Sequence, residues 1–350
     1  MKNSSPHIKT DKRVRSIFII LLVLVAVFMI LDILFGSVNI KASEVISAIF
    51  SHSGNNYETI ILKFRLPKAI TAIIVGVALS LSGLQMQTVF RNPMAGPDVL
   101  GISSGASLGV AFVILGFSRN ISPESLNGLG NWILVAASWV GAGAVMLLIM
   151  VISSKVKDIL AILILGIMLS SGISAIVTIL QYFSNESMLK AYVIWTMGSL
   201  GNLTSAQLNV LSISILAGVT LSLLSSKMLN ALLLGENYAG SIGLNVRHAR
   251  FIIFIGTSIL AGSVTAFCGP IGFIGIAVPH MVRILFKTSD HRILIPGTIL
   301  MGAVVMLASD LISQLPGSES VLPINAVTSL IGIPVVVWVI LNKRKYSVSF

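Results

Sequence analysis

The residues best suited to carry a function lie in one polar segment near the middle of an otherwise apolar chain. This segment, LGENYAGSIGLNVRHAR, extends from Leu234 to Arg250 between two long hydrophobic runs. Its ionisable side chains require water, and they are Glu236, Arg247, His248 and Arg250. Three glycines predict two short helical turns joined by a bend: Gly235, Gly240 and Gly243. An ordinary connecting loop and a docking site for a soluble partner both fit these residues.

Catalytic or metal chemistry is not indicated anywhere in the sequence. There is no G-x-x-x-x-G-K-[ST] phosphate loop, so nucleotide hydrolysis is not expected in this chain. The five histidines form no pair with metal-ligand spacing, and no H-E-x-x-H motif occurs. The single cysteine, Cys268, excludes an internal disulfide and a multi-cysteine metal site. We therefore predict no catalytic residue, no metal site and no cofactor in this chain.

The composition predicts a protein that lies in a lipid bilayer. Of the 350 residues, 55% are hydrophobic and only 10% are charged, whereas soluble domains carry about 25% charged residues. The net charge of +11 lies in short segments between apolar runs, so membrane topology explains it better than binding to nucleic acid. No polar stretch is long enough for a soluble domain. We predict an all-α, polytopic membrane protein with a single transmembrane domain over residues 1–350.

Ten apolar runs, the elements that must position the polar segment, are long enough to cross the bilayer as helices. They are expected at Ser16–Phe35, Pro67–Val89, Val99–Phe117, Trp132–Ile152, Ile159–Tyr182, Ala206–Leu224, Phe251–Phe267, Ile271–Phe286, Ile293–Ser313 and Pro323–Leu341. The first run is too long for the apolar core of a signal peptide, which predicts a retained helix. Between the first two runs, the amphipathic spacing of Lys41–Phe50 predicts a helix on the membrane surface.

The distribution of basic residues predicts the orientation. With ten spans and a cytoplasmic N-terminus, most of the 23 Lys and Arg residues fall in cytoplasmic segments, as the positive-inside rule requires. Both termini and the segment Leu234–Arg250 are then cytoplasmic. Three cations near the start of the second span are exceptions to this rule: Lys63, Arg65 and Lys68.

Ionisable residues are rare within the predicted spans, where Asp32 and Asp310 are the clearest examples, both near span ends. A proton-coupled carrier usually needs acidic or histidine relays at mid-membrane, so this class is disfavoured. Between the second and third spans, two prolines four residues apart force a non-helical stretch, Asn92–Pro97, at or near membrane depth. Such a break is typical of a pathway or gate, although close helix packing also selects glycine and proline.

Five segments together resemble a known family, the permease subunits of type II ABC importers for ferric siderophores, cobalamin or haem. They are RLPKAITAIIVGVALSLSGLQMQTVFRNPMAGPDVLGISSGASLG (Arg65–Gly109), WTMGSL (Trp195–Leu200), GENYAGSIGL (Gly235–Leu244), GPIGFIGIAVPHMVRILF…DHRILIPG (Gly269–Gly297) and LPINAVTSLIGIP (Leu322–Pro334). The segments follow the family order along nearly the whole chain. This resemblance implies a ten-helix permease that dimerises around a central translocation path in the cytoplasmic (inner) membrane of a bacterium.

The resemblance also implies partners and site residues. Two cytoplasmic ATPase subunits, which would hold ATP and Mg²⁺, are expected to dock on a coupling segment within about 227–250. The residues implied for that contact are Gly235, Glu236, Ala239, Gly243 and Leu244. An extracytoplasmic substrate-binding protein is expected to dock near Arg65 and Lys68, and the cytoplasmic gate corresponds to Asn92, Pro93 and Met94.

This chain departs from the family pattern at four positions. Lys68 replaces an arginine, which keeps the charge and loses a bidentate grip on a carboxylate. Met94 replaces the leucine of the N-P-L motif, and Asn325 replaces the glycine of L-P-x-G. Gln314 lies where relatives often carry a cation, which puts that docking contact in doubt.

The predicted function is an importer permease that moves an iron complex, a ferric siderophore, by alternating access. Cobalamin or haem is the alternative cargo within the same class. A secondary carrier, which needs no ATPase, and a membrane-embedded enzyme are the alternatives from other classes. The lipid bilayer and a second permease copy, most simply an identical one, complete the expected surroundings.

Overall fold

The computed structural model describes residues 6–36, 40–41, 43–45, 56–116, 129–153, 155–156, 159–201, 203–314 and 321–341. The described residues fold into helices, and no strand occurs among them. The helices are α1 (Pro6–Leu34), α3 (Asn56–Ile60), α4 (Leu66–Val89), α5 (Ile102–Ala111), α6 (Leu129–Ser153), α7 (Ile159–Tyr182), α8 (Glu186–Thr196), α9 (Ser205–Leu224), α10 (Ser226–Leu233), α11 (Glu236–Ser241), α12 (Val246–Cys268), α13 (Ile274–Phe286), α14 (His291–Ser313) and α15 (Ile324–Leu341). Two π-helical turns, η1 (Ile61–Arg65) and η2 (Phe112–Gly116), continue α3 into α4 and extend α5.

The predicted spans correspond to helices one by one. Within the described residues, seven helices are long and apolar enough to cross a membrane, and three shorter apolar helices cover Ile102–Gly116, Ile274–Phe286 and Ile324–Trp338. Of these three shorter helices, α5 and α13 each follow an irregular segment inside the bundle, which accounts for their reduced length. The fold is therefore the polytopic all-α architecture that hydropathy predicted. Of the surface segment predicted at Lys41–Phe50, residues 43–45 are helical and most others lie outside the described residues.

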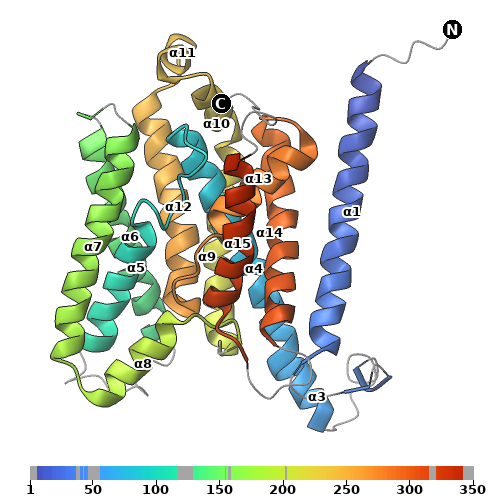
Figure 1. Ribbon diagram of the computed structural model, residues 1–350, viewed down its shortest axis with the longest axis vertical. Coiled ribbons are helices and arrows are strands. Elements are labelled where there is room, and N and C mark those ends of the chain that lie inside the picture. The colour runs from blue at the N-terminus through green and yellow to red at the C-terminus, as the bar shows by residue number, and fades with distance from the viewer. Residues whose placement is uncertain are drawn as a thin grey trace.

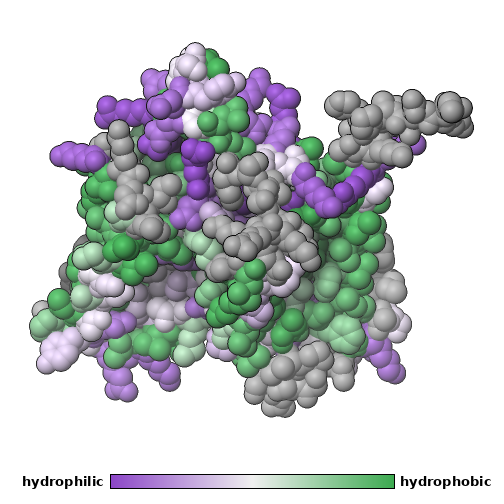
Figure 2. Space-filling model, turned by 45° about the horizontal axis from the view of Figure 1, so that its top comes forward, coloured by the Kyte–Doolittle hydropathy of each residue, from purple (hydrophilic) through white to green (hydrophobic). Residues whose placement is uncertain are grey.

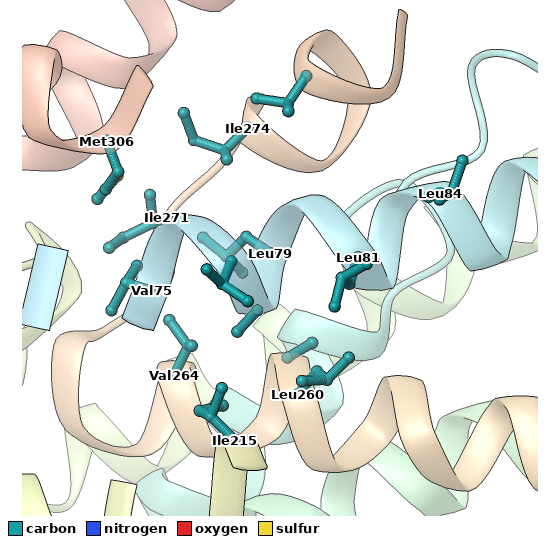
Figure 3. Packing of buried hydrophobic residues seen from close by; sticks show 14 of the residues in the cluster. Val75, Leu79, Leu81, Leu84, Ile215, Leu260, Val264, Ile271, Ile274 and Met306 are labelled. Carbon is teal, nitrogen blue, oxygen red and sulfur yellow. The ribbon is translucent and has the colours of Figure 1, made fainter. Parts of the chain in front are cut away.

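Helix α4 forms the centre of the bundle and is buried along most of its length. It packs against α14, α12, α13 and α9. Figure 3 shows side chains of α4, such as Leu79 and Leu81, surrounded by Leu260 and Val264 of α12, Ile215 of α9 and others. Because lipid tails are as apolar as these side chains, close van der Waals contact must hold the helices together.

Glycines allow the closest of these contacts. A Cβ atom at Gly76 would overlap the carbonyl of Gly302 on α14, and a Cβ at Gly302 would overlap Gly76 in return. About two turns further along α4, a Cβ at Gly83 would overlap the backbone of Gly275 on α13. Backbone faces backbone at these points, so even one methyl group has no space.

The bundle has two distinct ends (Figure 1). Helix α11 lies at one end, together with the N-terminal end of α1 and the C-terminal end of α15. Helices α3 and α8 lie at the other end. Helix α1 stands at the edge of the bundle, where it packs mainly on α14 and where Phe18 contacts the ring of Phe286 at a centroid distance of 4.8 Å.

The glycine contacts give a direct stability test. Gly302→Ala should lower the thermal unfolding midpoint of the purified protein in detergent, because overpacking against fixed backbone costs about 1–3 kcal/mol. Gly172→Ala on α7 is the matched control, since a Cβ there meets no neighbouring atom. There the change should be neutral or stabilising by up to about 1 kcal/mol. Equal midpoints for the two variants would contradict the assigned contact between α4 and α14.

Candidate translocation and coupling sites

The predicted gate segment forms an ordered, non-helical loop between α4 and α5. Asn92 Oδ1 accepts a hydrogen bond from the Met94 amide at 2.8 Å. The Pro93 carbonyl accepts one from Nε2 of His280 on α13, also at 2.8 Å. A Cβ at Gly96 would come within 2.8 Å of Ile276 on the same helix. The loop is thus folded against α13, and its backbone groups find partners in the protein, as non-helical backbone within a membrane requires.

Beside this loop lies a polar cavity with a volume of about 430 Å³. Its hydroxyl and amide side chains come from α5, α7, α8 and α15, and they are Ser103, Ser104, Ser107, Ser174, Thr178, Gln181, Tyr192, Thr196 and Asn325. Asp98 is the carboxylate among the lining residues, and Ser103 donates a hydrogen bond to it. Asn325 accepts one from the Gly272 amide at 3.1 Å. Sequence reasoning missed this cavity, because its lining residues come from four helices and the loop before α13.

The glycine of the family motif L-P-x-G is replaced here by Asn325, and the structure shows the consequence. Its side chain reaches across the cavity wall and fixes the irregular segment that precedes α13. In that segment Gly269 and Phe273 have positive φ values of 74° and 67°. Since a non-glycine residue such as Phe273 rarely adopts this conformation, external hydrogen bonds of this kind help to hold it.

The coupling segment forms a compact helical cap at one end of the bundle. Gly235, with φ 104°, separates α10 from α11, and Gly243, with φ 86°, ends the turn after α11. These are the two short helices and bends that the glycines predicted. The Arg250 guanidinium forms an ion pair with Glu236, which ties α11 to α12. Ala239 is fully buried, so it faces the rest of the chain rather than solvent.

Other residues of this cap are available to a partner. Tyr238 and Ile242, on or just after α11, are 50% and 57% exposed. Glu236, which the sequence predicted for this contact, is also exposed, with its side chain 51% accessible. The sequence prediction also included Ala239, which is buried, because the motif does not show which face of a six-residue helix turns outward. The contact of this segment with an ATPase stays a prediction, and the exposed side chains are the ones that could make it.

Two contacts connect the cap with the gate loop. The Arg91 side chain, which directly precedes Asn92, lies beside Gly235. In α10, Asn230 Oδ1 accepts a hydrogen bond from Nδ1 of His291 at 2.8 Å. The other ring nitrogen of His291 lies 2.8 Å from the Thr88 hydroxyl, just before the end of α4. A displacement of the cap would therefore reach α4 and the gate loop through packed, hydrogen-bonded side chains.

Asp290 anchors the same region at the start of α14. It accepts hydrogen bonds from the Arg292 amide at 2.9 Å and from the Asn230 side chain at 2.6 Å. Burial by itself raises the pKa of Asp290, but these hydrogen bonds and the charge of Arg292 hold it below the ordinary value. The carboxylate is thus charged at neutral pH, where it caps the N-terminus of α14.

The predicted docking residues lie at the opposite end of the bundle and are held by contacts within the chain. The Arg65 guanidinium donates to the carbonyls of Ile33 and Leu34, both at 2.8 Å, at the C-terminal end of α1. Lys68 forms an ion pair with Asp310 of α14 at 3.0 Å. Arg65 is only 8% exposed, and the Lys68 side chain is 19% exposed. These cations therefore join α1, α4 and α14, and their role in docking stays a prediction.

The buried side chain of Gln314 bridges two carboxylates, Asp32 and Asp310, at this end of the bundle. Its amide donates to Asp32 Oδ1 at 2.8 Å and to Asp310 Oδ2 at 3.2 Å. At this position the family resemblance implies a cation, whereas Gln314 is buried here and donates to both of these acidic groups. Lys63, in contrast, is exposed at this end of the bundle.

The fold defines a class: a multi-pass helical membrane protein with a polar cavity inside the bundle. The FecCD transport family model matches residues 22–342, and the chain belongs to that family. It is 38% identical to the hemin transport system permease protein HmuU of Yersinia pestis, over 81% of this chain and 84% of that protein. It is 34% identical to the vitamin B12 import system permease protein BtuC of Salmonella paratyphi A, over 82% and 85%.

The fold matches a solved structure of a metal-chelate type ABC transporter in an inward-facing conformation. The TM-score is 0.77 with 27% identity, over 94% of this chain and 99% of that chain. Together these similarities make the chain the membrane-spanning permease of an ABC importer, with ATP hydrolysis on a separate chain. They decide against the secondary carrier and the membrane-embedded enzyme.

The exposed side chains of the cap give a coupling test. Ile242→Asp should lower ATP-driven uptake more than tenfold in reconstituted vesicles, because a charge in the centre of an apolar contact removes a dominant binding residue. The thermal midpoint of the permease should stay unchanged, since Ile242 is exposed. Ala239→Arg should instead lower that midpoint, because Ala239 is fully buried. Normal uptake by Ile242→Asp would exclude this face of α11 as the coupling surface.

Docking at the opposite end can be separated from stability by comparing two sets of variants. Lys63→Glu should slow association of the binding protein, most strongly at low salt, and leave the thermal midpoint unchanged. Arg65→Glu with Lys68→Glu should also lower that midpoint, because it leaves Asp310 buried without its cation, a loss of about 3 kcal/mol or more. If the association rate changes neither with salt concentration nor with Lys63→Glu, the cluster of Lys63, Arg65 and Lys68 has a purely structural role.

Proposed function

We propose that this permease carries an iron complex, a ferric siderophore, into the bacterial cytoplasm by alternating access. The observation that carries this proposal is the chemistry of the polar cavity beside the gate loop. Besides the apolar Ile173, Val177 and Pro270, its described lining presents hydroxyl and amide groups and one carboxylate, and it includes no lysine or arginine. Such a surface suits a cargo rich in oxygen and nitrogen atoms that exchanges hydrogen bonds as it passes.

The same chemistry ranks the alternatives. Haem carries two carboxylates, and these would meet Asp98 without a compensating cation among the described lining residues. Cobalamin carries many neutral amides and fits the lining as well as a siderophore does, so it is the second candidate. The relatives described above are named as permeases for hemin and for vitamin B12, so both of these cargoes stay alternatives.

The proposed assembly contains two permease copies, two cytoplasmic ATPase subunits and an extracytoplasmic binding protein. The exposed residues of α11 would face the ATPases, which would hold ATP and Mg²⁺, and both termini would be cytoplasmic. Closure of the ATPases would displace the cap, and Arg91 and the Asn230–His291–Thr88 contacts would pass this displacement to α4. The loop at Asn92, Pro93 and Met94 would then change its contacts with α13 and open or close the path.

Substrate identity can be tested with the complete importer in vesicles. We expect ATP-dependent uptake of a ferric siderophore, and uptake of haem at a much lower rate. Asp98→Lys should reduce siderophore uptake about tenfold, a difference of about 1.4 kcal/mol, because it removes the acceptor of the Ser103 hydrogen bond and places an unpaired cation in the lining. Asp98→Asn, the control, keeps an acceptor for Ser103 and should retain most of the uptake. Preferential uptake of cobalamin or haem would overturn the assignment.

A further inference from the structure

A second hollow, the α6–α12 groove, lies away from the polar cavity, between α6 and α12. It has a volume of about 370 Å³ and is lined almost entirely by apolar side chains, among them Met146, Leu147 and Phe254. Trp139 forms part of its wall, and its ring nitrogen donates to Ser263 at 2.8 Å, which fixes the indole. Gly143 also lines the groove, and a Cβ atom there would meet no atom within 4 Å. The groove is thus an open space with a rigid wall.

The groove continues into a basic mouth at the end of the bundle that carries α11. This mouth is a separate hollow lined by Asn245, Arg247 and His248. It shares Met150 and Phe251 with the α6–α12 groove. Arg247 and His248 are exposed. Hydrophilic residues gather over this end of the molecule, above apolar sides (Figure 2). A polar, cationic mouth therefore opens directly onto the apolar α6–α12 groove.

The N-terminus of α12 adds to the positive character of this mouth. Asn245 caps the helix by accepting a hydrogen bond from the His248 amide at 3.1 Å. The amides of Val246 and Arg247 come earlier in the first turn, where a helix has no carbonyl partners of its own. They and the helix dipole favour an anion at this position.

The dimensions match one leaflet of a bilayer. Along α12 the groove extends from Phe251 to Ile259, which is about 12 Å at the helical rise of 1.5 Å per residue. Half of a hydrocarbon core about 30 Å thick is about 15 Å. An acyl chain whose headgroup lies at Arg247 would therefore follow the groove through most of its leaflet.

We propose that the α6–α12 groove binds one phospholipid with an anionic headgroup. Its phosphate lies at the mouth formed by Arg247, His248 and the start of α12, and one acyl chain lies against Trp139, Gly143 and Phe254. Charge complementarity selects this occupant, because a second protein helix would cover the apolar groove without using the basic mouth. The occupant would brace α12, which begins directly after the cap formed by α11.

Lipid retention by the full-length protein in detergent tests the proposal. Native mass spectrometry is used to count bound phosphatidylglycerol and phosphatidylcholine with identical acyl chains. We expect one phosphatidylglycerol per chain in preference to phosphatidylcholine. Arg247→Gln should lower this preference about fivefold, the effect of one basic residue near an anionic lipid surface. Arg250→Gln is the matched control, because it removes a charge that is paired with Glu236 and does not line the mouth.

A second pair of variants tests the apolar part of the groove. Gly143→Leu should reduce retention of both lipids, because the new side chain fills the groove without displacing neighbours. Gly172→Leu, at an equally open position on α7, should not. The proposal fails if Arg247→Gln and Arg250→Gln behave alike, or if Gly143→Leu leaves retention unchanged. It also fails if Gly143→Leu alters the oligomeric state instead of the lipid count, since the groove would then seat a second copy.

Discussion

The contact between the backbones of α4 and α14 at Gly76 and Gly302 is the constraint on which the rest of the bundle depends. Helices in a membrane gain little from hydrophobic burial against each other, so they are held by contact at the shortest distance that the backbone allows. Because α4 touches α9, α12, α13 and α14, its position sets the positions of four other helices. The same helix ends just before the non-helical loop at Asn92–Pro97, so packing in the bundle centre also fixes where this loop begins.

Polar groups inside the bundle are arranged to join helices. Gln85 of α4 donates to Ser222 of α9 and accepts from Thr257 of α12, both within 2.8 Å. Gln87 donates to the Ile276 carbonyl at 3.2 Å and accepts from Arg283, so α4 is also joined to α13. Each such group would be costly if it lacked a partner in the membrane. The pairs therefore fix which helix faces reach one another, in addition to holding them together.

The two ends of the bundle use their charges differently. At the end with α11, charged residues such as Arg247 are exposed, while Asp290 and Asn230 link the cap to the membrane helices. At the other end, Lys68 and Asp310 close a contact between α4 and α14. The first end therefore leaves charged groups open to solvent, whereas the second end uses its charges to join α1, α4 and α14.

The sequence by itself determined the spans and the break at Asn92–Pro97, because hydropathy and proline geometry are local properties of the chain. It also determined the bends of the cap, since Gly235 and Gly243 adopt the positive φ values that their residue type favours. Only the tertiary structure decided that Arg65 bonds to the end of α1 and that Ala239 faces inward. It alone assembled the polar cavity as well, because hydrogen bonds and burial depend on which helices meet, and residues far apart in sequence decide that.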